Sequence, residues 1–285
     1  MRIFLINPPS NCSDTLPWLE PLGLSYIGAV CRDAGHDVRI RDLLTIEKAD
    51  IPALFAELDG FRPDLVGFTA MSEHFRNGLE LARAVKSRYG CTVVFGGWHV
   101  SGEPRAALES AIDFVVRGEG EDTILELLDY LQGKGPALDQ IDGIAYEKDG
   151  ILRITRARDR IKKLARLPAP MREGLPVGSY RFPMLYSVPV SRMNTLSVQA
   201  SRGCPYKCVF CQTPALWSNL WSKRAPVAVV DEIEELVNRY NINTLIFRDE
   251  EFTIRPQWVM EICEEMARRG LPKKITWGSF ARVDD

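Results

Sequence analysis

The chain has 285 residues, of which 46% are hydrophobic and 26% are charged, and its formal net charge is −2. This length suits about two domains, and so small a charge argues against a nucleic-acid partner or a membrane-surface partner. No apolar run approaches the roughly 20 residues that a membrane-spanning helix needs. Seven cysteines, an odd number, indicate a reducing cytoplasm rather than a disulfide framework.

Short apolar strands alternate with amphipathic helices through residues 1–133. Strands are predicted over 2–7, 38–42, 65–69, 92–96 and 114–117, and helices over 23–34, 51–59, 77–89, 104–110 and 122–131. This alternation is typical of a parallel sheet covered by helices on both faces. It predicts an α/β fold that begins with a five-stranded, doubly wound, Rossmann-like domain.

The rest of the chain divides into a connecting segment and a second α/β region. Residues 134–195 hold a predicted hairpin, with strands over 144–147 and 151–155 around Lys148-Asp149-Gly150, and then a proline-rich linker. Residues 196–285 alternate again, with strands over 196–199, 244–248 and 275–281 and helices over 227–240 and 257–269. The pattern predicts three β/α units in this last region.

Glycines and small polar residues follow several predicted strands of the first domain. Ligands bind at the carboxyl ends of the strands in such sheets, and glycine lets the backbone approach a ligand closely. The residues singled out as candidate cofactor contacts are Pro9, Ser10, Gly23, Met71, Ser72, Gly96, Gly97, His99, Gly118, Glu119 and Gly120.

Three cysteines, Cys204, Cys208 and Cys211, follow the first strand of the second region with the spacing C-x3-C-x2-C. Thiolates bind iron, and a cubane iron–sulfur cluster normally takes four cysteine ligands. Three ligands in one loop therefore leave one iron open for a further ligand. The alternative is a zinc site, but structural zinc sites are closed by four ligands, and the only later cysteine is Cys263, inside a helical pattern.

The segment Arg202-Gly203-Cys204-Pro205-Tyr206-Lys207-Cys208-Val209-Phe210-Cys211, here called the cysteine loop (residues 202–211), resembles the signature loop of the radical S-adenosylmethionine (SAM) superfamily. The resemblance implies a [4Fe–4S] cluster whose open iron holds the amino and carboxylate groups of SAM. It also implies that Phe210 lies against the adenine, and that the catalytic domain is a six-stranded partial barrel. Residues 196–285 supply about half of such a barrel, so we expect the chain to be a fragment or a truncated relative.

Two further runs match positions that bind SAM in this superfamily. Arg248-Asp249-Glu250-Glu251-Phe252-Thr253 follows the second strand of the last region. The resemblance assigns Glu251 to the SAM ammonium group, with Asp249 and Glu250 in support, and the alternative is a solvated acidic turn. Arg282, in Arg282-Val283-Asp284, is assigned to the SAM carboxylate, because a guanidinium group fits a carboxylate through two hydrogen bonds.

The candidate loops of the first domain, in this order and ahead of the cysteine loop, resemble the cobalamin-binding domain of cobalamin-dependent radical SAM enzymes. The chain departs from the D-x-H-x-x-G motif of many cobalamin proteins, because residues 7–14 hold no histidine and Gly97 stands where aspartate would precede His99. We therefore expect cobalamin without a histidine lower ligand, and the loop Met71-Ser72-Glu73-His74 under the corrin. His74 is the one candidate cobalt ligand, His36 is expected to be structural, and Cys12 is placed near the corrin.

The resemblance implies a SAM-cleaving enzyme that transfers a methyl group to an unactivated carbon or a phosphinate. It also implies a small-molecule substrate and an external electron donor such as flavodoxin or ferredoxin. The run 211–217 followed by Arg248-Asp249-Glu250-Glu251 is also similar to the anaerobic oxidative cyclases of porphyrin metabolism, so cyclisation is the alternative reaction. A third alternative is a truncated cobalamin-binding module without full activity.

Overall fold

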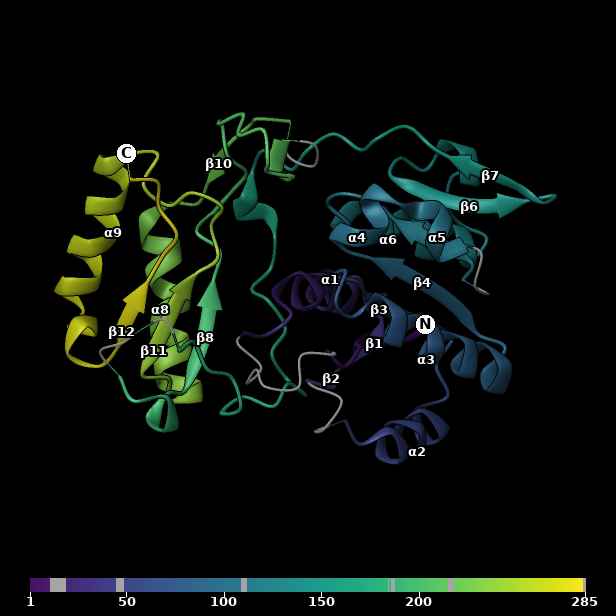
Figure 1. Cartoon of the computed structure of the whole chain (residues 1–285), viewed down its shortest axis with the longest axis horizontal. Helices are drawn as coiled ribbons and strands as arrows, with labels where there is room; N and C mark the ends of the chain where they lie inside the picture. The colour runs from purple at the N-terminus through teal and green to yellow at the C-terminus, as the bar shows by residue number, and fades with distance from the viewer. Residues whose placement is uncertain are drawn as a thin grey trace. The chain divides into compact units, whose positions relative to one another are not determined.

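The computed structural model describes residues 1–10, 19–44, 49–108, 112–183, 185, 188–214 and 218–283. The chain forms two compact units (Figure 1). The N-terminal unit comprises Met1–Thr15, Gly23–Arg160 and Pro168–Leu175, and the C-terminal unit comprises Leu16–Leu22, Ile161–Leu167 and Pro176–Asp285. In the described part of the chain, no helix is long and apolar enough to span a bilayer.

One seven-stranded sheet, in the order β2-β1-β3-β4-β5-β6-β7, is the centre of the N-terminal unit. Its strands are β1 (Arg2–Asn7), β2 (Asp37–Asp42), β3 (Leu65–Thr69), β4 (Thr92–Gly96), β5 (Phe114–Val116), β6 (Ile144–Lys148) and β7 (Ile151–Ile154). The first five are parallel, which confirms the predicted doubly wound α/β class. The strand order reverses between β1 and β3, and ligands bind at such switch points.

Helices cover this sheet as the apolar pattern predicts. They are α1 (Leu22–Asp33), α2 (Ile51–Phe61), α3 (Phe75–Tyr89), α4 (Trp98–Gly102), α5 (Pro104–Leu108) and α6 (Glu121–Leu131). Helices α2 to α5 bury their apolar residues against one face of the sheet, where Phe4 and Ile6 of β1 lie. The short helix α4 was not predicted from the sequence, and residues 109–110 of the predicted helix 104–110 lie outside the described residues.

The predicted hairpin extends the sheet instead of belonging to the connecting segment. Strand β6 pairs antiparallel with β5, and β7 pairs antiparallel with β6. The turn between them has Asp149 at φ 55° and Gly150 at φ 73°, the two positive φ angles that a two-residue hairpin turn needs. The sheet therefore has two more strands than the five that the sequence predicts.

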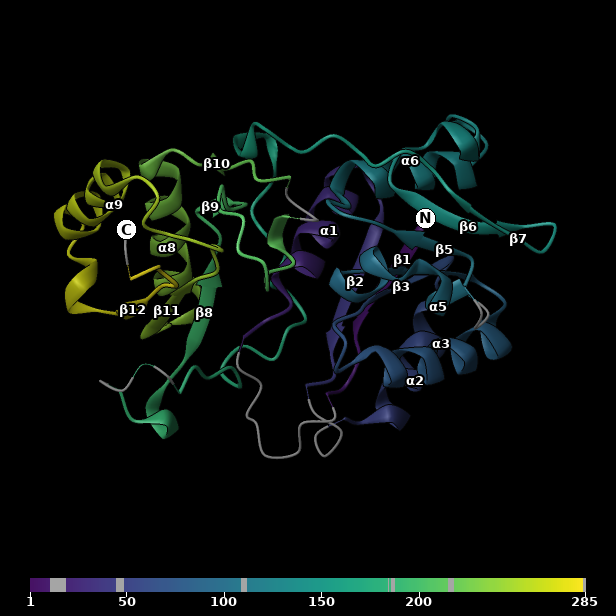
Figure 2. The same cartoon turned by 45° about the horizontal axis from the view of Figure 1, so that its top comes forward.

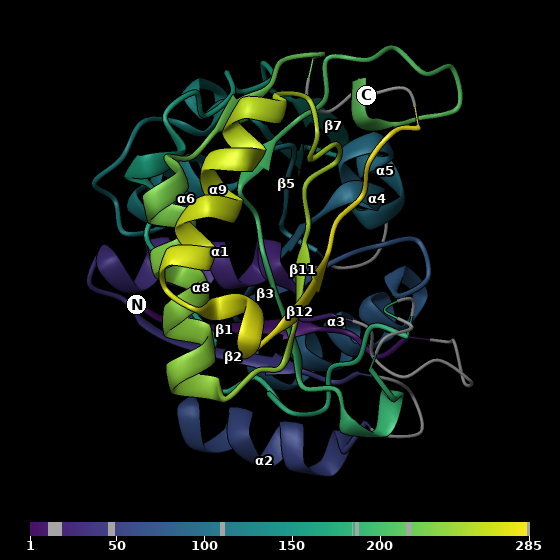
Figure 3. The ribbon, with the colours of Figure 1, turned by 90° about the vertical axis from the view of Figure 1, so that its left-hand side faces the viewer.

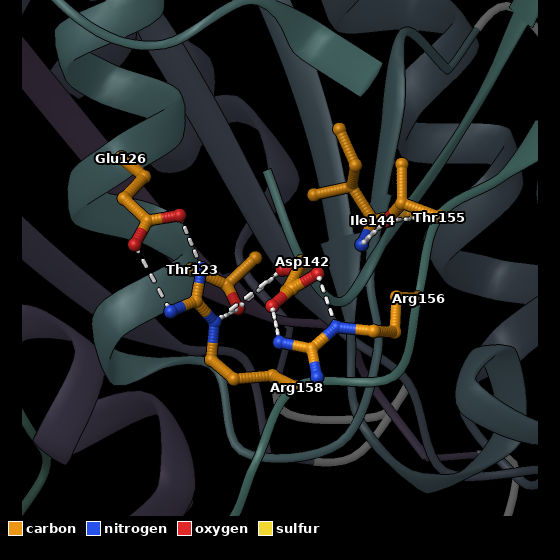
Figure 4. A network of polar contacts seen from close by, with 7 residues as sticks. All are labelled: Thr123, Glu126, Asp142, Ile144, Thr155, Arg156 and Arg158. Atoms are coloured by element: carbon orange, nitrogen blue, oxygen red, sulfur yellow. Dashed lines mark hydrogen bonds and ion pairs between the residues drawn. The ribbon is translucent and has the colours of Figure 1, made fainter. Parts of the chain in front are cut away.

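The segment after the hairpin is fastened to α6 by a polar network. Figure 4 shows its members, which are Thr123, Glu126, Asp142, Ile144, Thr155, Arg156 and Arg158. The guanidinium group of Arg158 pairs with the Glu126 carboxylate and donates to Thr123 Oγ1 at 2.7 Å. Arg156 donates to both oxygens of Asp142, at 3.2 and 2.5 Å. Arg156 and Arg158 thus fasten the extended segment that follows β7, which pairs with no strand among the described residues.

The C-terminal unit contains a three-stranded parallel sheet in the order β12-β11-β8. Its strands are β8 (Thr195–Val198), β11 (Thr244–Phe247) and β12 (Thr276–Gly278), joined by helices α8 (Pro226–Tyr240) and α9 (Pro256–Arg268). The two helices lie side by side over this sheet (Figure 3). A two-stranded antiparallel ribbon, β9 (Ser201–Arg202) with β10 (Ser222–Lys223), brackets the cysteine loop (Figure 2).

Candidate cluster and cofactor sites

The three cysteines of the cysteine loop follow β9, which belongs to the two-stranded ribbon of the C-terminal unit. Cys204 and Cys208 are partly buried, Cys211 is exposed, and none of them forms a disulfide within the described residues. A turn in which Cys211 N donates to Cys208 O at 3.0 Å closes the second half of the loop. The Thr213 amide donates to Cys211 Sγ at 3.4 Å, so one thiol already has a backbone hydrogen bond.

The thiol set fits a cubane cluster better than a single metal ion. Among the described residues, no three His, Cys, Asp or Glu side chains converge closely enough to hold one ion. In a cubane each thiolate binds a different iron, so its ligands need not converge on one point. A closed zinc site, the alternative considered from the sequence, needs four converging ligands. Burial raises the pKa of the Cys204 thiol, and the nearby Glu251 carboxylate raises it further, so binding iron would release a proton.

The predicted adenine contact, Phe210, is exposed on the tip of the cysteine loop. Its side chain is 88% exposed, and that of Val209 beside it is fully exposed. Large apolar side chains in this state are available to a ligand. The position suits the predicted role, which stays a prediction.

The acidic run after β11 holds the entry to the cysteine loop. The Asp249 carboxylate accepts hydrogen bonds from Ser201 Oγ at 2.5 Å and Ala200 N at 3.1 Å. Glu250 Oε2 accepts from Gly203 N at 2.9 Å, directly before the first cysteine. Asp249 is 1% exposed, so the run is not a solvated acidic turn.

Glu251, the predicted ligand of the SAM ammonium group, is 2% exposed. Its Oε1 accepts from Thr253 N at 2.9 Å and from Thr253 Oγ1 at 2.6 Å, and its Oε2 accepts from Arg282 N at 2.7 Å. A carboxylate has about four acceptor positions, so room remains for one more donor. The carboxylate is thus held rigidly by segments that follow two different strands.

Arg282, the predicted partner of the SAM carboxylate, contacts the cysteine loop in this structure. Its guanidinium carbon lies 4.0 Å from the centroid of the Tyr206 ring, and its Nη1 donates to Cys208 Sγ at 3.5 Å. Sequence reasoning gave Tyr206 no role, because the residue that meets it is far away along the chain. The adjacent cysteines were the only local signal at this position.

We expect the stability of the C-terminal unit to depend on pH through the carboxyl group of Asp249. Burial raises the pKa of its carboxyl to about 7, from an ordinary value of 3.8, although Ser201 and Ala200 donate to it. The native state then holds a proton that the unfolded chain releases between these two values, so the unfolding free energy is expected to fall as pH rises from about 4 to about 7. Asp249→Asn is expected to remove this slope.

The measurement is denaturant unfolding of the C-terminal unit, followed by tryptophan fluorescence at several pH values. Asp231→Asn, on the exposed face of α8, is the control and should leave the slope as in the parent chain. An unchanged slope in Asp249→Asn would contradict the assignment of this titration to Asp249.

The carboxyl edge of the N-terminal sheet brings the predicted cobalamin loops together at the switch point. Asn77 Nδ2, in the first turn of α3, donates to Pro9 O at 2.7 Å, which joins the loop after β1 to that after β3. Ser10 N donates to Leu44 O at 3.0 Å, beyond the end of β2. Met71, after β3, is 45% exposed and is available to a ligand at this edge.

Gly97 fixes the contact between the loops after β3 and β4. It has φ 107°, and a Cβ there would lie 2.7 Å from Ala70 O and 2.9 Å from Ala70 N. Ala70 N donates to Gly96 O at 2.8 Å, and His99 N donates to Ala70 O at 3.1 Å. His99 Nδ1 lies 3.0 Å from Ser72 Oγ. The predicted cofactor contacts Ser72, Gly97 and His99 therefore lie side by side at this edge of the sheet.

Three of the remaining predicted contacts follow β5, and the fourth lies at the start of α1. Gly118 N, after β5, donates to Ser101 Oγ at 3.0 Å. Glu119 is buried and lies 3.9 Å from Arg160, and Gly120 is the residue before α6. Gly23 is the second residue of α1. Glu20, which the sequence did not suggest, is buried in the C-terminal unit and accepts from Ser197 N at 2.8 Å.

The three histidines of the chain are placed differently. His74 Nε2 pairs with Glu73 at 3.0 Å, and burial lowers the pKa of His74. The His99 ring packs on Phe75 with a centroid distance of 4.2 Å. His36 Nδ1 lies 3.1 Å from the Met1 amino group, at the opposite end of β1. Cys12 lies outside the described residues.

Comparisons with known proteins agree with the two units. Residues 17–128 match the family model of the B12 binding domain, and residues 198–281 match that of the radical SAM superfamily. The fold resembles that of the cobalamin-dependent SAM radical enzyme OxsB, with a TM-score of 0.79, 22% identity, and coverage of 99% of this chain and 39% of that chain. It also resembles the radical SAM methyltransferase TsrM from Kitasatospora setae, with a TM-score of 0.72, 22% identity, and coverage of 97% and 53%.

Curated relatives match along the whole chain. An uncharacterised methyltransferase of Pyrococcus horikoshii is 32% identical over 100% of this chain and 60% of its own length. An anaerobic magnesium-protoporphyrin IX monomethyl ester cyclase of Cereibacter sphaeroides is 31% identical over 100% of this chain and 46% of its own. The chain therefore spans about half of the length of these relatives.

A unit with the strand order β2-β1-β3-β4-β5 that matches the B12 binding model, followed by a unit that matches the radical SAM model, defines the class of this protein. The chain belongs to the cobalamin-binding-domain-containing family of radical SAM enzymes. This confirms the resemblance that the sequence predicts, and with it cobalamin, SAM and a [4Fe–4S] cluster as the cofactors.

Proposed function

We propose that the chain forms the cobalamin-binding and SAM-cleaving parts of an enzyme that methylates an unactivated carbon or a phosphinate. The single observation that carries the proposal is the cysteine loop, whose entry is held by Asp249 and Glu250. When bound, the cluster supplies the electron that cleaves SAM, and cobalamin carries the methyl group. The relatives support this reaction class, and one of them is a cytidylyl-2-hydroxyethylphosphonate methyltransferase of Streptomyces wedmorensis, 26% identical over 100% of this chain and 61% of its own length.

In this proposal the residues of the C-terminal unit position SAM. Cys204, Cys208 and Cys211 hold the cluster. Glu251, held by three hydrogen bonds, receives the ammonium group with support from Glu250, and Arg282 binds the carboxylate. Phe210 covers the adenine. SAM cleavage is tested by anaerobic reconstitution, addition of a reductant and assay of 5′-deoxyadenosine. The proposal would be contradicted if the parent chain formed no more 5′-deoxyadenosine than a variant in which Cys204, Cys208 and Cys211 are replaced by alanine.

The carboxyl edge of the N-terminal unit is the proposed cobalamin site. The loop Met71-Ser72-Glu73-His74 would hold the lower side of the corrin, and Gly97 with His99 would contact its edge. We expect no histidine ligand to the cobalt, because residues 7–14 hold no histidine and His74 Nε2 pairs with Glu73. The loops after β1 and β5, with Pro9, Ser10 and Gly118 to Gly120, complete the edge.

The lower face gives a spectroscopic prediction. Cob(II)alamin bound to the full chain is expected to show an electron paramagnetic resonance spectrum without nitrogen superhyperfine splitting. His74→Ala is expected to leave that spectrum unchanged, because the imidazole is held by Glu73. A nitrogen splitting that disappears in His74→Ala would show instead that His74 binds the cobalt.

A second candidate reaction is oxidative cyclisation of a porphyrin ester. It is supported by the cyclase relatives, which are 29% to 31% identical over the whole of this chain. Product analysis separates the two reactions, since one adds a methyl group and the other forms a ring. For either reaction we propose a small-molecule substrate, a cytoplasmic location and a flavodoxin or ferredoxin as electron donor. A nucleic-acid partner is not part of the proposal.

A further inference from the structure

Arg282 ties three separate segments of the C-terminal unit together. It follows β12, yet its backbone N donates to Glu251 Oε2 at 2.7 Å, after β11. Its guanidinium group stacks 4.0 Å from the centroid of the Tyr206 ring and donates to Cys208 Sγ at 3.5 Å. Both guanidinium contacts, with Tyr206 and Cys208, lie in the cysteine loop. This side chain therefore reaches a predicted cluster ligand from 74 residues away.

The chemistry of these contacts points to the cluster itself. A planar guanidinium group can stack on an aromatic ring and still donate hydrogen bonds along its edge, which an ammonium group cannot do in the same way. The reduction potential of an iron–sulfur cluster depends on net charge and on hydrogen bonds to its sulfurs. A cation that donates to a ligand sulfur favours the reduced, more negative cluster, and such outer contacts also orient the ligands.

We propose that Arg282 is a positioning residue of the cluster, which fixes the cysteine loop through Tyr206 and raises the reduction potential through Cys208 Sγ. This rests on the proposed function only in that the three cysteines bind a cluster. The role differs from binding the SAM carboxylate, because it operates before SAM is present. All measurements that test it are therefore made without SAM.

The first test is a redox titration of the reconstituted full chain. Arg282→Met keeps the aliphatic stem but removes the charge and the donor. At a fixed potential it is expected to lower the ratio of reduced to oxidised cluster about tenfold, which is about 59 mV for one electron. Arg282→Lys keeps the charge, so its cluster is expected to have a reduction potential between those of the parent chain and Arg282→Met.

The chain offers a matched control at the end of α8. Arg239 lies 5.2 Å from the centroid of the Tyr240 ring and pairs with Glu235, on an exposed surface. Arg239→Met removes the same charge and the same kind of stacking without a contact to a cysteine. It is expected to leave the potential of the cluster unchanged.

The second test does not need a cluster. In the metal-free chain, amide hydrogen exchange in the cysteine loop is expected to be about tenfold faster in Arg282→Met and in Tyr206→Leu, and unchanged in Arg239→Met. If the Arg282 variants take up no iron, the amide hydrogen exchange of the metal-free chain tests the proposal alone. Faster exchange confined to the cysteine loop supports the proposal, and unchanged exchange overturns it.

An Arg282→Met cluster with the parent potential would overturn the inference while leaving the proposed function intact. Failure of the parent chain itself to take up iron and sulfide would instead contradict the proposed function. The exchange measurement would still establish whether the contact of Arg282 with Tyr206 orders the loop.

Discussion

Replacement of Cys204, Cys208 and Cys211 together by alanine is expected to abolish cluster binding. Anaerobic reconstitution of the parent chain should yield about four irons and four sulfides per chain, as a cubane requires. The triple variant should retain none, because thiolates are the only ligands that the loop offers to iron. Iron and sulfide assays with the visible absorption spectrum measure the loss.

Cys263→Ala is the matched control for the cluster variants. Cys263 lies in α9, outside the cysteine loop, and burial raises the pKa of its thiol. Such a cysteine behaves as a small apolar side chain, so its removal should leave iron and sulfide at the parent level. A triple variant with the parent iron content and spectrum would refute the assignment of the loop.

The second large effect is expected for Gly97→Ala in the N-terminal unit. Its backbone, at φ 107° and ψ 179°, lies in a region that is nearly restricted to glycine, and a Cβ would lie 2.7 Å from Ala70 O. Strain and overpacking each cost about 1–3 kcal/mol, so the unit is expected to lose about 3 kcal/mol of unfolding free energy.

The same substitution should weaken cobalamin binding at least tenfold, about 1.4 kcal/mol, because the loops after β3 and β4 must separate. Thermal unfolding and cobalamin titration measure the two effects. Gly102→Ala is the control, since a Cβ there meets nothing within 4 Å, and a change below about 1 kcal/mol is expected. Parent-like stability and affinity in Gly97→Ala would show that the close approach is not required.

The sequence predicts strands well where burial leaves one interpretation. In β1, the consecutive residues Ile3, Phe4, Leu5 and Ile6 are all buried, and Asn7-Pro8-Pro9 limits this run to the length of a strand with both faces covered. The predicted loops of the N-terminal unit also lie at strand ends, because the alternation of strands and helices determines which ends share an edge. The short helix α4 was missed, since five residues are too few for a helical period.

The hairpin shows why pairing partners are harder to predict. Its turn residues, Asp149 and Gly150, are a local signal, so the hairpin itself was predicted. Its addition to β5 depends on an edge left open by strands far away in the chain. The arginines that fasten the following segment to α6 have the same character, because Arg158 meets Glu126 only after both elements are placed.

The sequence by itself determined a three-thiolate loop that suits an iron–sulfur cluster, and a glycine-rich ligand edge on a parallel sheet, because both signals lie within a few residues. The resemblance of these motifs to known families supplied cobalamin and SAM. Only the tertiary structure decided which groups surround the cysteine loop: Asp249 and Glu250 on the entry to the loop, and Arg282 on Tyr206 and Cys208. These contacts join residues 47 to 76 positions apart, and their geometry follows from the packing of β8, β11 and β12 rather than from any local pattern.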